Sequence, residues 1–238
     1  MSGLAVENLC VRLGGAKVLD AIDFAPGEGW SGVLGANGSG KTTLLRCIAG
    51  RLPVGSGTIR LNGEDVSNSQ ARRAELIGFA PPLETLPNLL TVREIIVLSA
   101  AAHRTEPRFK GDLFDALGIG SLLNRRIEVL SSGNRQRVSN FLAFNGNSNV
   151  VLLDEPFNWL DPVATFEFKN VLKNMSLEGI TVITTLHDIA SFISLCDGGL
   201  VLRDGKVIYS YASRSLMISS SDPANLEREI YDAMATSS

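Results

Sequence analysis

A glycine-rich segment near the N-terminus has the residue types and the spacing to bind phosphate. It consists of Gly35, Ala36, Asn37, Gly38, Ser39, Gly40, Lys41 and Thr42, and it fits the pattern G-x-x-x-x-G-K-S/T. Its glycines allow backbone conformations in which N–H groups converge on phosphate oxygens, and the helix expected after it presents its positive end to the same anion. We therefore expect residues 35–43, Thr43 included, to bind a nucleoside triphosphate, most simply ATP. Lys41 would neutralise the β and γ phosphates, and the Thr42 hydroxyl would bind Mg²⁺.

A pair of acids follows an apolar run in the second half of the chain. Residues 150–153 are Val-Val-Leu-Leu, and Asp154 and Glu155 come directly after them. At the carboxyl end of a buried strand, Asp154 can reach a Mg²⁺ ion beside the phosphate loop, and Glu155 can polarise a water for attack on the γ-phosphate. Taken alone, the two acids are equally compatible with an ordinary acidic turn at the end of a strand.

Short apolar or β-branched runs alternate with longer helical stretches through the middle of the chain. Strands are expected at residues 31–34, 76–80, 150–153 and 181–186, and helices at 41–51, from 92 to about 123, 131–145 and 162–174. Strands this apolar are typical of a sheet covered on both faces. The alternation predicts an α/β core with a parallel sheet.

Antiparallel pairs are predicted near both ends of the chain. Strands at 4–13 and 18–24 flank Gly14–Gly15, a strand at 58–61 precedes Asn62–Gly63, and strands at 200–203 and 207–209 flank Asp204–Gly205. A last helix is expected over about 222–236. Asp222 would cap it before Pro223, and Leu226, Ile230 and Met234 would form its apolar stripe.

Composition places the chain among ordinary globular proteins. Apolar residues make up 45% and charged residues 20% of the 238 residues, and the net charge of −3 gives no basis for a nucleic-acid partner. The three cysteines lie far apart without metal-ligand spacing, which favours a reduced cytosolic compartment. The longest apolar stretch, near 95–102, is far shorter than the roughly 20 residues that span a bilayer.

A third segment connects these motifs to a known family. Residues 130–137 read LSSGNRQR, which resembles the LSGGQxQR signature of ABC-type ATPases. Residues 158–161 resemble that family's D-loop, His187 resembles its switch histidine, and residues 89–94 resemble the opening of its helical subdomain. The motifs follow the family's order over roughly residues 4–210. Each has a plain alternative when taken alone: Ser131 and Asp161 as helix N-caps, and His187 as a structural histidine. His103 is expected on the solvated surface.

The resemblance implies a single nucleotide-binding domain over residues 1–238. This domain would have a P-loop core, an N-terminal antiparallel β subdomain and an inserted helical subdomain at about 83–145. Two such subunits would pack head to tail, with ATP between one phosphate loop and the signature of the other, namely Ser131, Ser132, Gly133 and Asn134. Glu155 would be the general base and His187 would contact the γ-phosphate. A separate transmembrane permease subunit would be the second partner, contacted by residues 81–93, which places the chain in the cytoplasm, peripheral to the membrane.

Three departures from the family pattern indicate a slow ATPase. Leu13 replaces the aromatic residue that stacks on adenine, so an aliphatic face would contact the base. Pro82 replaces a glutamine that touches Mg²⁺ and the attacking water, and proline offers neither a side-chain oxygen nor a backbone donor. Water or a neighbour such as Glu84 would have to take its place. In the signature, Ser132 and Asn134 replace glycine and glutamine.

The favoured interpretation is the ATP-hydrolysing subunit of a transporter, and two alternatives remain open. One is a soluble ABC-type ATPase outside transport, for example in iron–sulfur cluster assembly. The other is an ATP-operated clamp that dimerises with little hydrolysis, for which Pro82 and Asn134 argue and against which Glu155 argues. Co-purification with membranes rather than with the cytosol would distinguish the transporter subunit from the first alternative. Dimerisation in ATP without turnover would identify the second.

Overall fold

A six-stranded sheet forms the centre of the computed structural model, which describes residues 3–211 and 223–235. The strand order is β10-β9-β3-β8-β7-β6. All neighbours are parallel except β9 and β10, which form an antiparallel hairpin. The strands are β3 (Trp30–Leu34), β6 (Ile77–Phe79), β7 (Val150–Leu153), β8 (Thr181–Leu186), β9 (Gly198–Arg203) and β10 (Lys206–Tyr211). Every residue of β3, β7 and β8 is buried, as strands covered on both faces require.

A second, antiparallel sheet packs over one end of the first. Its order is β2-β1-β4-β5, with β1 (Leu4–Leu13), β2 (Ala16–Phe24), β4 (Ser56–Leu61) and β5 (Glu64–Asp65). The predicted turn between β1 and β2 is present, with φ of 56° at Gly14 and 86° at Gly15. The register of β1 against β2 shifts between Val6 and Leu9 and between Leu9 and Val11, so the hairpin is bulged and strongly twisted.

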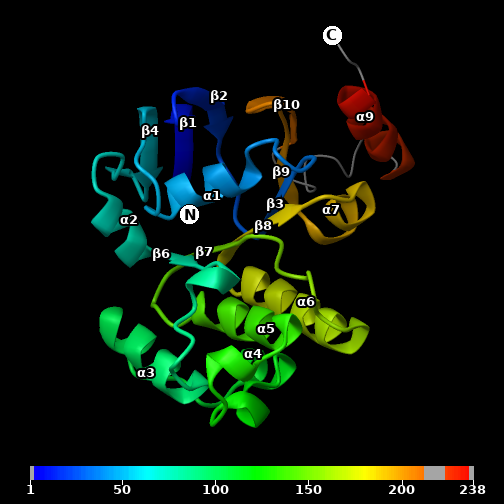
Figure 1. The fold of residues 1–238 in the computed structure, drawn as a ribbon. Coiled ribbons are helices and arrows are strands. Elements are labelled where there is room, and N and C mark those ends of the chain that lie inside the picture. Colours follow the sequence, from blue (N-terminus) through cyan, green and yellow to red (C-terminus); the bar gives the residue numbers. More distant parts are fainter. Residues whose placement is uncertain (1–2, 212–222, 236–238) are drawn as a thin grey trace.

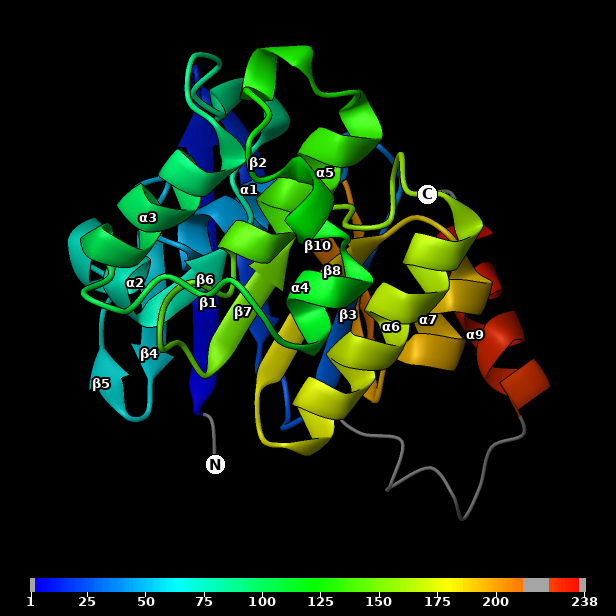
Figure 2. The same cartoon turned by 90° about the horizontal axis from the view of Figure 1, so that it is seen from below.

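Two buried clusters lie on opposite faces of the central sheet (Figure 1). On one face, α1 (Lys41–Ile48) and the antiparallel sheet bury residues such as Leu44 and Ile22 against Ile183 of β8. On the other face, helices cover the sheet, and Val182 of β8 points to them. Figure 2 shows α3 (Val92–Ala102), α4 (Asp112–Ala116), α5 (Ser132–Leu142) and α6 (Pro162–Leu177) in front of the strands. The predicted α/β class with one parallel and one antiparallel portion is therefore confirmed.

The helical stretch predicted from residue 92 to about 123 is not continuous in the structure. Helix α3 ends at Ala102, α4 spans only Asp112–Ala116, and 3₁₀ turns follow at Ile119–Leu122 and Ile127–Val129. Gly111 and Gly118 adopt φ values of 111° and 60°, which no helix accommodates. His103 is half-buried at the C-cap of α3, where its Nδ1 lies 3.0 Å from the Ser99 carbonyl oxygen, so its predicted solvated position is also corrected.

Other predicted helices differ only at their ends. The first predicted helix, residues 41–51, ends at Ile48 because Gly50 adopts a φ of 70°. The helix after Asp161 runs to Leu177, three residues beyond the predicted end. In both cases the apolar periodicity is correct and the terminus is determined by local backbone geometry.

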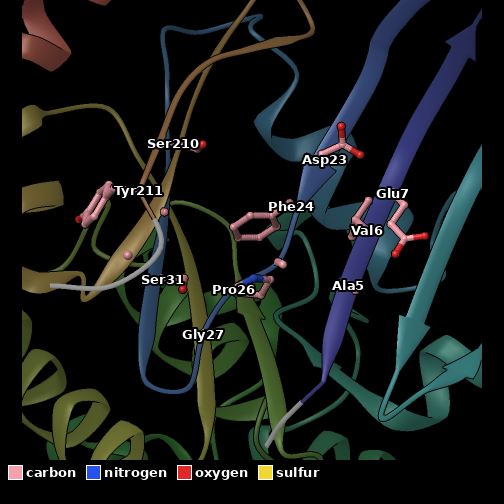
Figure 3. A pocket seen from close by; sticks show the side chains of 13 residues that line it. Ala5, Val6, Glu7, Asp23, Phe24, Pro26, Gly27, Ser31, Ser210 and Tyr211 are labelled. Atoms are coloured by element: carbon pink, nitrogen blue, oxygen red, sulfur yellow. The ribbon is translucent and has the colours of Figure 1, made fainter. Parts of the chain in front are cut away.

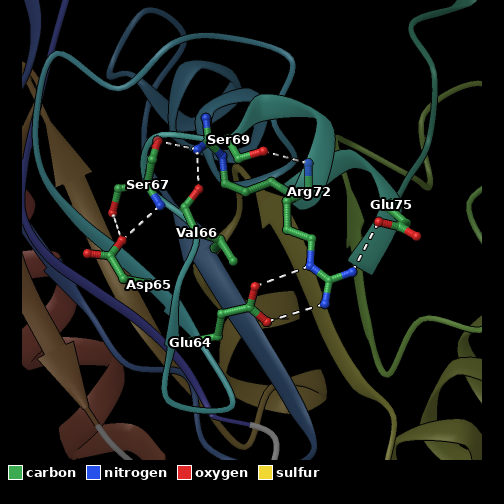
Figure 4. A network of polar contacts seen from close by, with 8 residues as sticks. Glu64, Asp65, Val66, Ser67, Ser69, Arg72 and Glu75 are labelled. Atoms are coloured by element: carbon green, nitrogen blue, oxygen red, sulfur yellow. Dashed lines mark hydrogen bonds and ion pairs between the residues drawn. The ribbon is translucent and has the colours of Figure 1, made fainter.

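Helix α2 (Gln70–Leu76) is fastened to β5 by exposed polar contacts (Figure 4). The Ser69 hydroxyl accepts a hydrogen bond from the Arg72 N–H at 3.1 Å and so caps the helix. The Arg72 side chain in turn pairs with Glu64 at 3.2 Å and with Glu75 at 3.1 Å. Such exposed pairs orient the helix without contributing much stability.

The next residue, Arg73, anchors the same helix from inside. Its side chain is fully buried and donates to four backbone carbonyls, which are those of Cys47 at 3.0 Å, Val66 at 2.7 Å, Leu52 at 3.2 Å and Ser67. These carbonyls belong to the end of α1 and to the loops around β4 and β5. Arg73 therefore fixes the far end of the helix that begins at the phosphate loop.

The C-terminal helix α9 (Pro223–Ala235) packs beside α7 (Ile189–Leu195) and β10. Leu226 and Ile230 are buried and Met234 is partly buried, so the predicted apolar stripe forms the packed face. The Tyr209 hydroxyl donates to Glu229 at 2.8 Å and adds a polar tie to β10. The predicted cap, Asp222, lies outside the described residues. Within those residues, no helix combines the length and the apolar character that crossing a membrane requires.

Candidate functional site

The phosphate loop connects β3 to α1 by a glycine-dependent turn. Gly38 has a φ of 82° and Gly40, the N-cap of α1, has a φ of 106°. A Cβ at Gly35 would lie 2.4 Å from the Leu202 carbonyl oxygen, so a side chain cannot fit there. Ala36, Asn37 and Gly38 are exposed, which leaves the crest of the loop open to a ligand. This combination of left-handed residues and an open crest suits an anion held by backbone N–H groups.

Lys41 lies folded along the inside of this loop. Only 5% of the residue is exposed, and its Nζ donates to the carbonyls of Gly35 at 2.6 Å and Ala36 at 3.1 Å. Burial lowers the pKa of Lys41 from its usual value, while the nearby carboxylates of Glu155 and Asp154 act in the opposite direction. The Ser39 hydroxyl is also buried, and it has no hydrogen-bond partner within the part of the chain that the structure describes. A lysine and an unpaired hydroxyl on a glycine-rich loop fit a phosphate group.

The β9–β10 turn supports the loop from behind. The Gly205 N–H donates to the Ser39 carbonyl at 3.0 Å, and the Gly205 carbonyl accepts from the Asp20 N–H at 2.8 Å. These bonds connect the phosphate loop to the β1–β2 hairpin, which carries Leu13 at its tip. Leu13 is 39% exposed and so offers the aliphatic face that the sequence predicts.

Asp154 and Glu155 leave the end of β7 and are held by Thr185 of the neighbouring strand β8. The Thr185 hydroxyl donates to Asp154 Oδ1 at 2.8 Å and accepts from the Glu155 N–H at 2.7 Å. Glu155 has a left-handed φ of 46°, and Asn158 Nδ2 donates to its Oε2 at 2.5 Å. The two carboxylates are thus oriented by bonds to their own turn and to the adjacent strand.

The acids and the phosphate loop meet at a hollow of about 310 Å³. Its lining includes Thr42, Asp154 and Glu155. One hydroxyl and one or two carboxylates match the few protein ligands with which Mg²⁺ is usually held beside a nucleotide. Among the described residues, no group of three or more histidines, cysteines or acids converges on a metal position. The remaining Mg²⁺ ligands would therefore be phosphate oxygens and waters.

The rest of the lining contains residues with a predicted role and residues without one. Pro82 and Glu84 line it, as expected of the segment where the family's glutamine is missing. Arg46 of α1 and Ser139 of α5 also line it and were not anticipated. Gln136 and Trp159 line it too, and they lie within the predicted signature and D-loop segments, although no role was predicted for either. The spacing of three residues between Gln136 and Ser139 is the sequence signal that would have indicated a shared helix face.

The four signature residues lie outside this hollow. Ser131 is the N-cap of α5 and its hydroxyl accepts from the Asn134 N–H at 3.3 Å, as the capping alternative predicts. Ser131 and Ser132 are exposed, and residues 131–134 do not take part in the lining. A Cβ at Gly133 would lie 2.5 Å from the Trp159 carbonyl oxygen, so the signature packs closely on the 158–161 turn. Helix α5 lies in the helical layer, across the sheet from α1 (Figure 1).

His187 and Asp161 occupy the same end of the sheet without entering the hollow. His187 is exposed and follows β8 directly. Asp161 caps α6 by accepting from the N–H groups of Val163 at 3.1 Å and Ala164 at 2.9 Å, and it also pairs with Arg137 of α5. The Ala164 bond is the main cause that lowers the pKa of Asp161.

A separate hollow of about 380 Å³ lies between the two sheets (Figure 3). Acidic and aromatic residues line it, among them Glu7, Asp23, Phe24 and Tyr211. Its lining contains none of the site residues predicted from the sequence. This second hollow is therefore separate from the predicted site beside the phosphate loop.

Comparison with known proteins gives one consistent result. The sequence model of the ABC transporter family matches residues 21–158. An uncharacterized ABC transporter ATP-binding protein of Methanocaldococcus jannaschii is 32% identical over 211 residues, which cover 87% of this chain and 76% of that protein. The lipopolysaccharide export system ATP-binding protein LptB of Escherichia coli is 28% identical over 220 residues, covering 87% and 90% respectively.

A solved structure with the same fold is the dimeric post-hydrolysis state of an ATP-binding cassette bound to ADP and Pi. It superimposes with a TM-score of 0.76 at 22% identity and covers 89% of this chain and 99% of that chain. At this identity the likeness concerns the fold.

Proposed function

Because the chain belongs to the ABC transporter family, we propose that it is the subunit that binds and hydrolyses ATP to drive a membrane transporter. The observation that carries this proposal is the hollow in which Thr42 of the phosphate loop meets Asp154 and Glu155. A phosphate-binding loop beside a metal-binding acid and a positioned carboxylate is the arrangement that phosphoryl transfer to water requires.

Each residue has a distinct task in this mechanism. Residues 35–43 bind the phosphates, Leu13 contacts the base and Lys41 neutralises the β and γ oxygens. A Mg²⁺ ion held by Thr42 and Asp154 would supply further neutralisation of the charge that develops on the phosphates. Glu155 accepts a proton from the attacking water, and its hydrogen bond from Asn158 fixes its direction. His187, exposed at the same sheet edge, contacts the γ-phosphate once the site closes.

The exposed signature supports a site shared between two subunits. Ser131 and Ser132 are exposed and lie outside the hollow of their own chain, so they are free to contact a nucleotide held by a partner. The N-terminus of α5 would then present its positive end to that γ-phosphate. ATP bound between the two subunits thus holds them together, and its hydrolysis removes this contact. The fold alone relates this chain to the dimeric cassette described above.

A groove beside the Pro81–Pro82 segment supports docking of the permease subunit. It has a volume of about 320 Å³, and its lining includes Phe79, Leu86, Ile95 and Leu98. Leu98 is 56% exposed, which leaves an apolar surface for a partner. Docking here would hold the chain at the cytoplasmic face of a membrane through a separate spanning subunit.

Association driven by ATP tests the shared site. Glu155→Gln should form a dimer with Mg-ATP in sedimentation velocity, because binding proceeds while hydrolysis stops. Adding Ser131→Arg should keep the protein monomeric, since a bulky cation replaces the serine at the partner's nucleotide. Ser121→Arg, which changes another exposed serine of the helical layer, should leave the dimer intact. A monomer in ATP for Glu155→Gln itself would contradict the proposal.

A further inference from the structure

Three polar side chains on α5 face inward, between two apolar layers. Gln136 is 6% exposed, Ser139 is 1% exposed and Asn140 is fully buried. The spacing of three and four residues puts them on one face of the helix. Buried polar groups require hydrogen-bond partners, and these three find theirs in one another and in the turns at Pro81 and Pro156.

Two of the three side chains donate to proline carbonyls that lie next to lining residues of the hollow. The Ser139 hydroxyl donates to the Pro81 carbonyl at 2.5 Å, next to Pro82. Asn140 Nδ2 donates to the Pro156 carbonyl at 2.7 Å, next to Glu155. The helix that begins at the signature is therefore tied to both the Pro82 wall and the Glu155 turn.

The Pro156 carbonyl also fixes how two side-chain amides point. A carbonyl oxygen can only accept, so Asn140 must direct its Nδ2 to Pro156 and its Oδ1 to Gln136. Gln136 must then donate through Nε2, which it does at 3.1 Å. Its Oε1 is left without a hydrogen-bond partner among residues 3–211 and 223–235, and Gln136 lines the hollow. The Gln136 Oε1 is thus an uncharged acceptor without a partner among those residues, and Gln136 lines the same hollow as Asp154 and Glu155.

We propose that the Gln136 amide oxygen helps to position the attacking water in this site. This inference rests on the proposed ATPase function. Pro82 lines the same hollow but has no side-chain oxygen, so the loop wall cannot supply an amide. Gln136 Oε1 accepts a hydrogen bond from the water that Glu155 deprotonates, and it does so without adding a negative charge to a lining that already contains Glu84, Asp154 and Glu155.

A consequence of this assignment is that binding in one site is coupled to chemistry in the other. Gln136 lies on the same helix as Ser131, which would contact the partner's nucleotide. Any shift of α5 on dimer closure moves Gln136 within its own chain's hollow. Through Asn140, the Gln136 side chain is also connected to the Pro156 carbonyl, next to Glu155.

The test replaces Gln136 with methionine, which is similar in size and has no oxygen. Gln136→Met should lower kcat about 10- to 100-fold, the effect of a misplaced reactant. Its Kd for ATP, followed by the fluorescence of Trp159 in the same lining, should stay within about threefold of the wild type, since the phosphate loop is unchanged. Gln70→Met makes the same chemical change on an exposed helix position and should alter neither quantity.

A second variant distinguishes the loss of an amide from a general folding defect in Gln136→Met, because only the former can be rescued by a new amide. Pro82→Gln places an amide in the same lining, at a position where φ of −54° and ψ of 141° suit any residue. In the Gln136→Met background it should restore kcat at least about fivefold, and in the wild type it should change kcat less than about twofold.

Three results would overturn the assignment: an unchanged kcat in Gln136→Met, a Kd that rises as much as kcat falls, or a large gain from Pro82→Gln alone. Absence of hydrolysis in the wild type would instead refute the proposed function, and this inference with it.

Discussion

Thr185 can be replaced so that the orientation of Asp154 and Glu155 is lost while the packing is kept. Its fully buried hydroxyl donates to Asp154 Oδ1 and accepts from the Glu155 N–H. Thr185→Val keeps the shape of the side chain and removes both bonds. A bond to a charged group contributes about 1.5–3 kcal/mol, and a buried N–H left unpaired costs about 1–3 kcal/mol. Because such terms are not additive, we expect Thr185→Val to lower the free energy of unfolding by about 3 kcal/mol.

The same change should reduce catalysis strongly, because it releases both acids from their anchor. We expect kcat for ATP to fall about 10- to 100-fold through loss of positioning. Urea unfolding gives the stability, and phosphate release under saturating Mg-ATP gives kcat.

Thr184→Val is the matched control on the same strand. Thr184 is also fully buried, but its hydroxyl accepts from Trp30 Nε1 at 2.9 Å on the other face of the sheet. This variant should lose about 1–2 kcal/mol of stability and keep its kcat. Equal losses of kcat in the two variants, or a wild-type kcat in Thr185→Val, would show that Thr185 does not position Asp154 and Glu155 for catalysis.

Arg73→Met should lower the free energy of unfolding by about 3 kcal/mol in a urea titration, because four backbone carbonyls lose a buried charged donor. Arg72→Met, which affects only exposed ion pairs, should change it little, and a similar loss in both variants would contradict the role of Arg73. Burial raises the pKa of the Cys47 thiol to about 11 and that of Cys196 to about 12, from a usual value of 9.0. A thiol reagent at pH 8 should thus react rapidly with Cys10 alone in the folded protein and with all three thiols in urea. The unfolded chain loses these protons first. The contribution of the two thiols to stability is therefore constant below about pH 9 and falls above it by up to about 1.4 kcal/mol per pH unit and thiol, until the folded-state pKa is reached. Stability that stays flat from pH 9 to 11 would contradict this linkage.

The parts of the site that could be predicted are those that a short contiguous pattern specifies. The phosphate loop and the Asp154–Glu155 pair each depend on one strand end, so strand periodicity and motif spacing placed them correctly at one edge of the sheet. The buried strands β3, β7 and β8 were recognised for the same reason. Their residues are mostly apolar or β-branched on both faces, and few other elements share that pattern.

The parts that escaped prediction depend on contacts between distant segments. Gln136 and Ser139 reach the hollow only because α5 packs against the Pro81 and Pro156 turns, which no local pattern reveals. Nothing in the sequence marks Arg73 as buried. It is buried because the end of α1 and the loops around β4 and β5 cover it. The long helix expected after residue 92 is interrupted, in part because Gly111 and Gly118 adopt positive φ values. The sequence alone does not reveal which φ a glycine adopts.

The most direct test of the account is phosphate release by the purified protein with Mg-ATP, measured against Glu155→Gln. We expect slow release by the wild type, stimulated when the permease subunit is present, and none above background by Glu155→Gln. We expect a low rate because the signature departs from the family pattern at Ser132 and Asn134, while Lys41, Asp154 and Glu155 keep it above zero. Wild-type release indistinguishable from that of Glu155→Gln, with and without the permease, would contradict the claim that this chain is an ATPase.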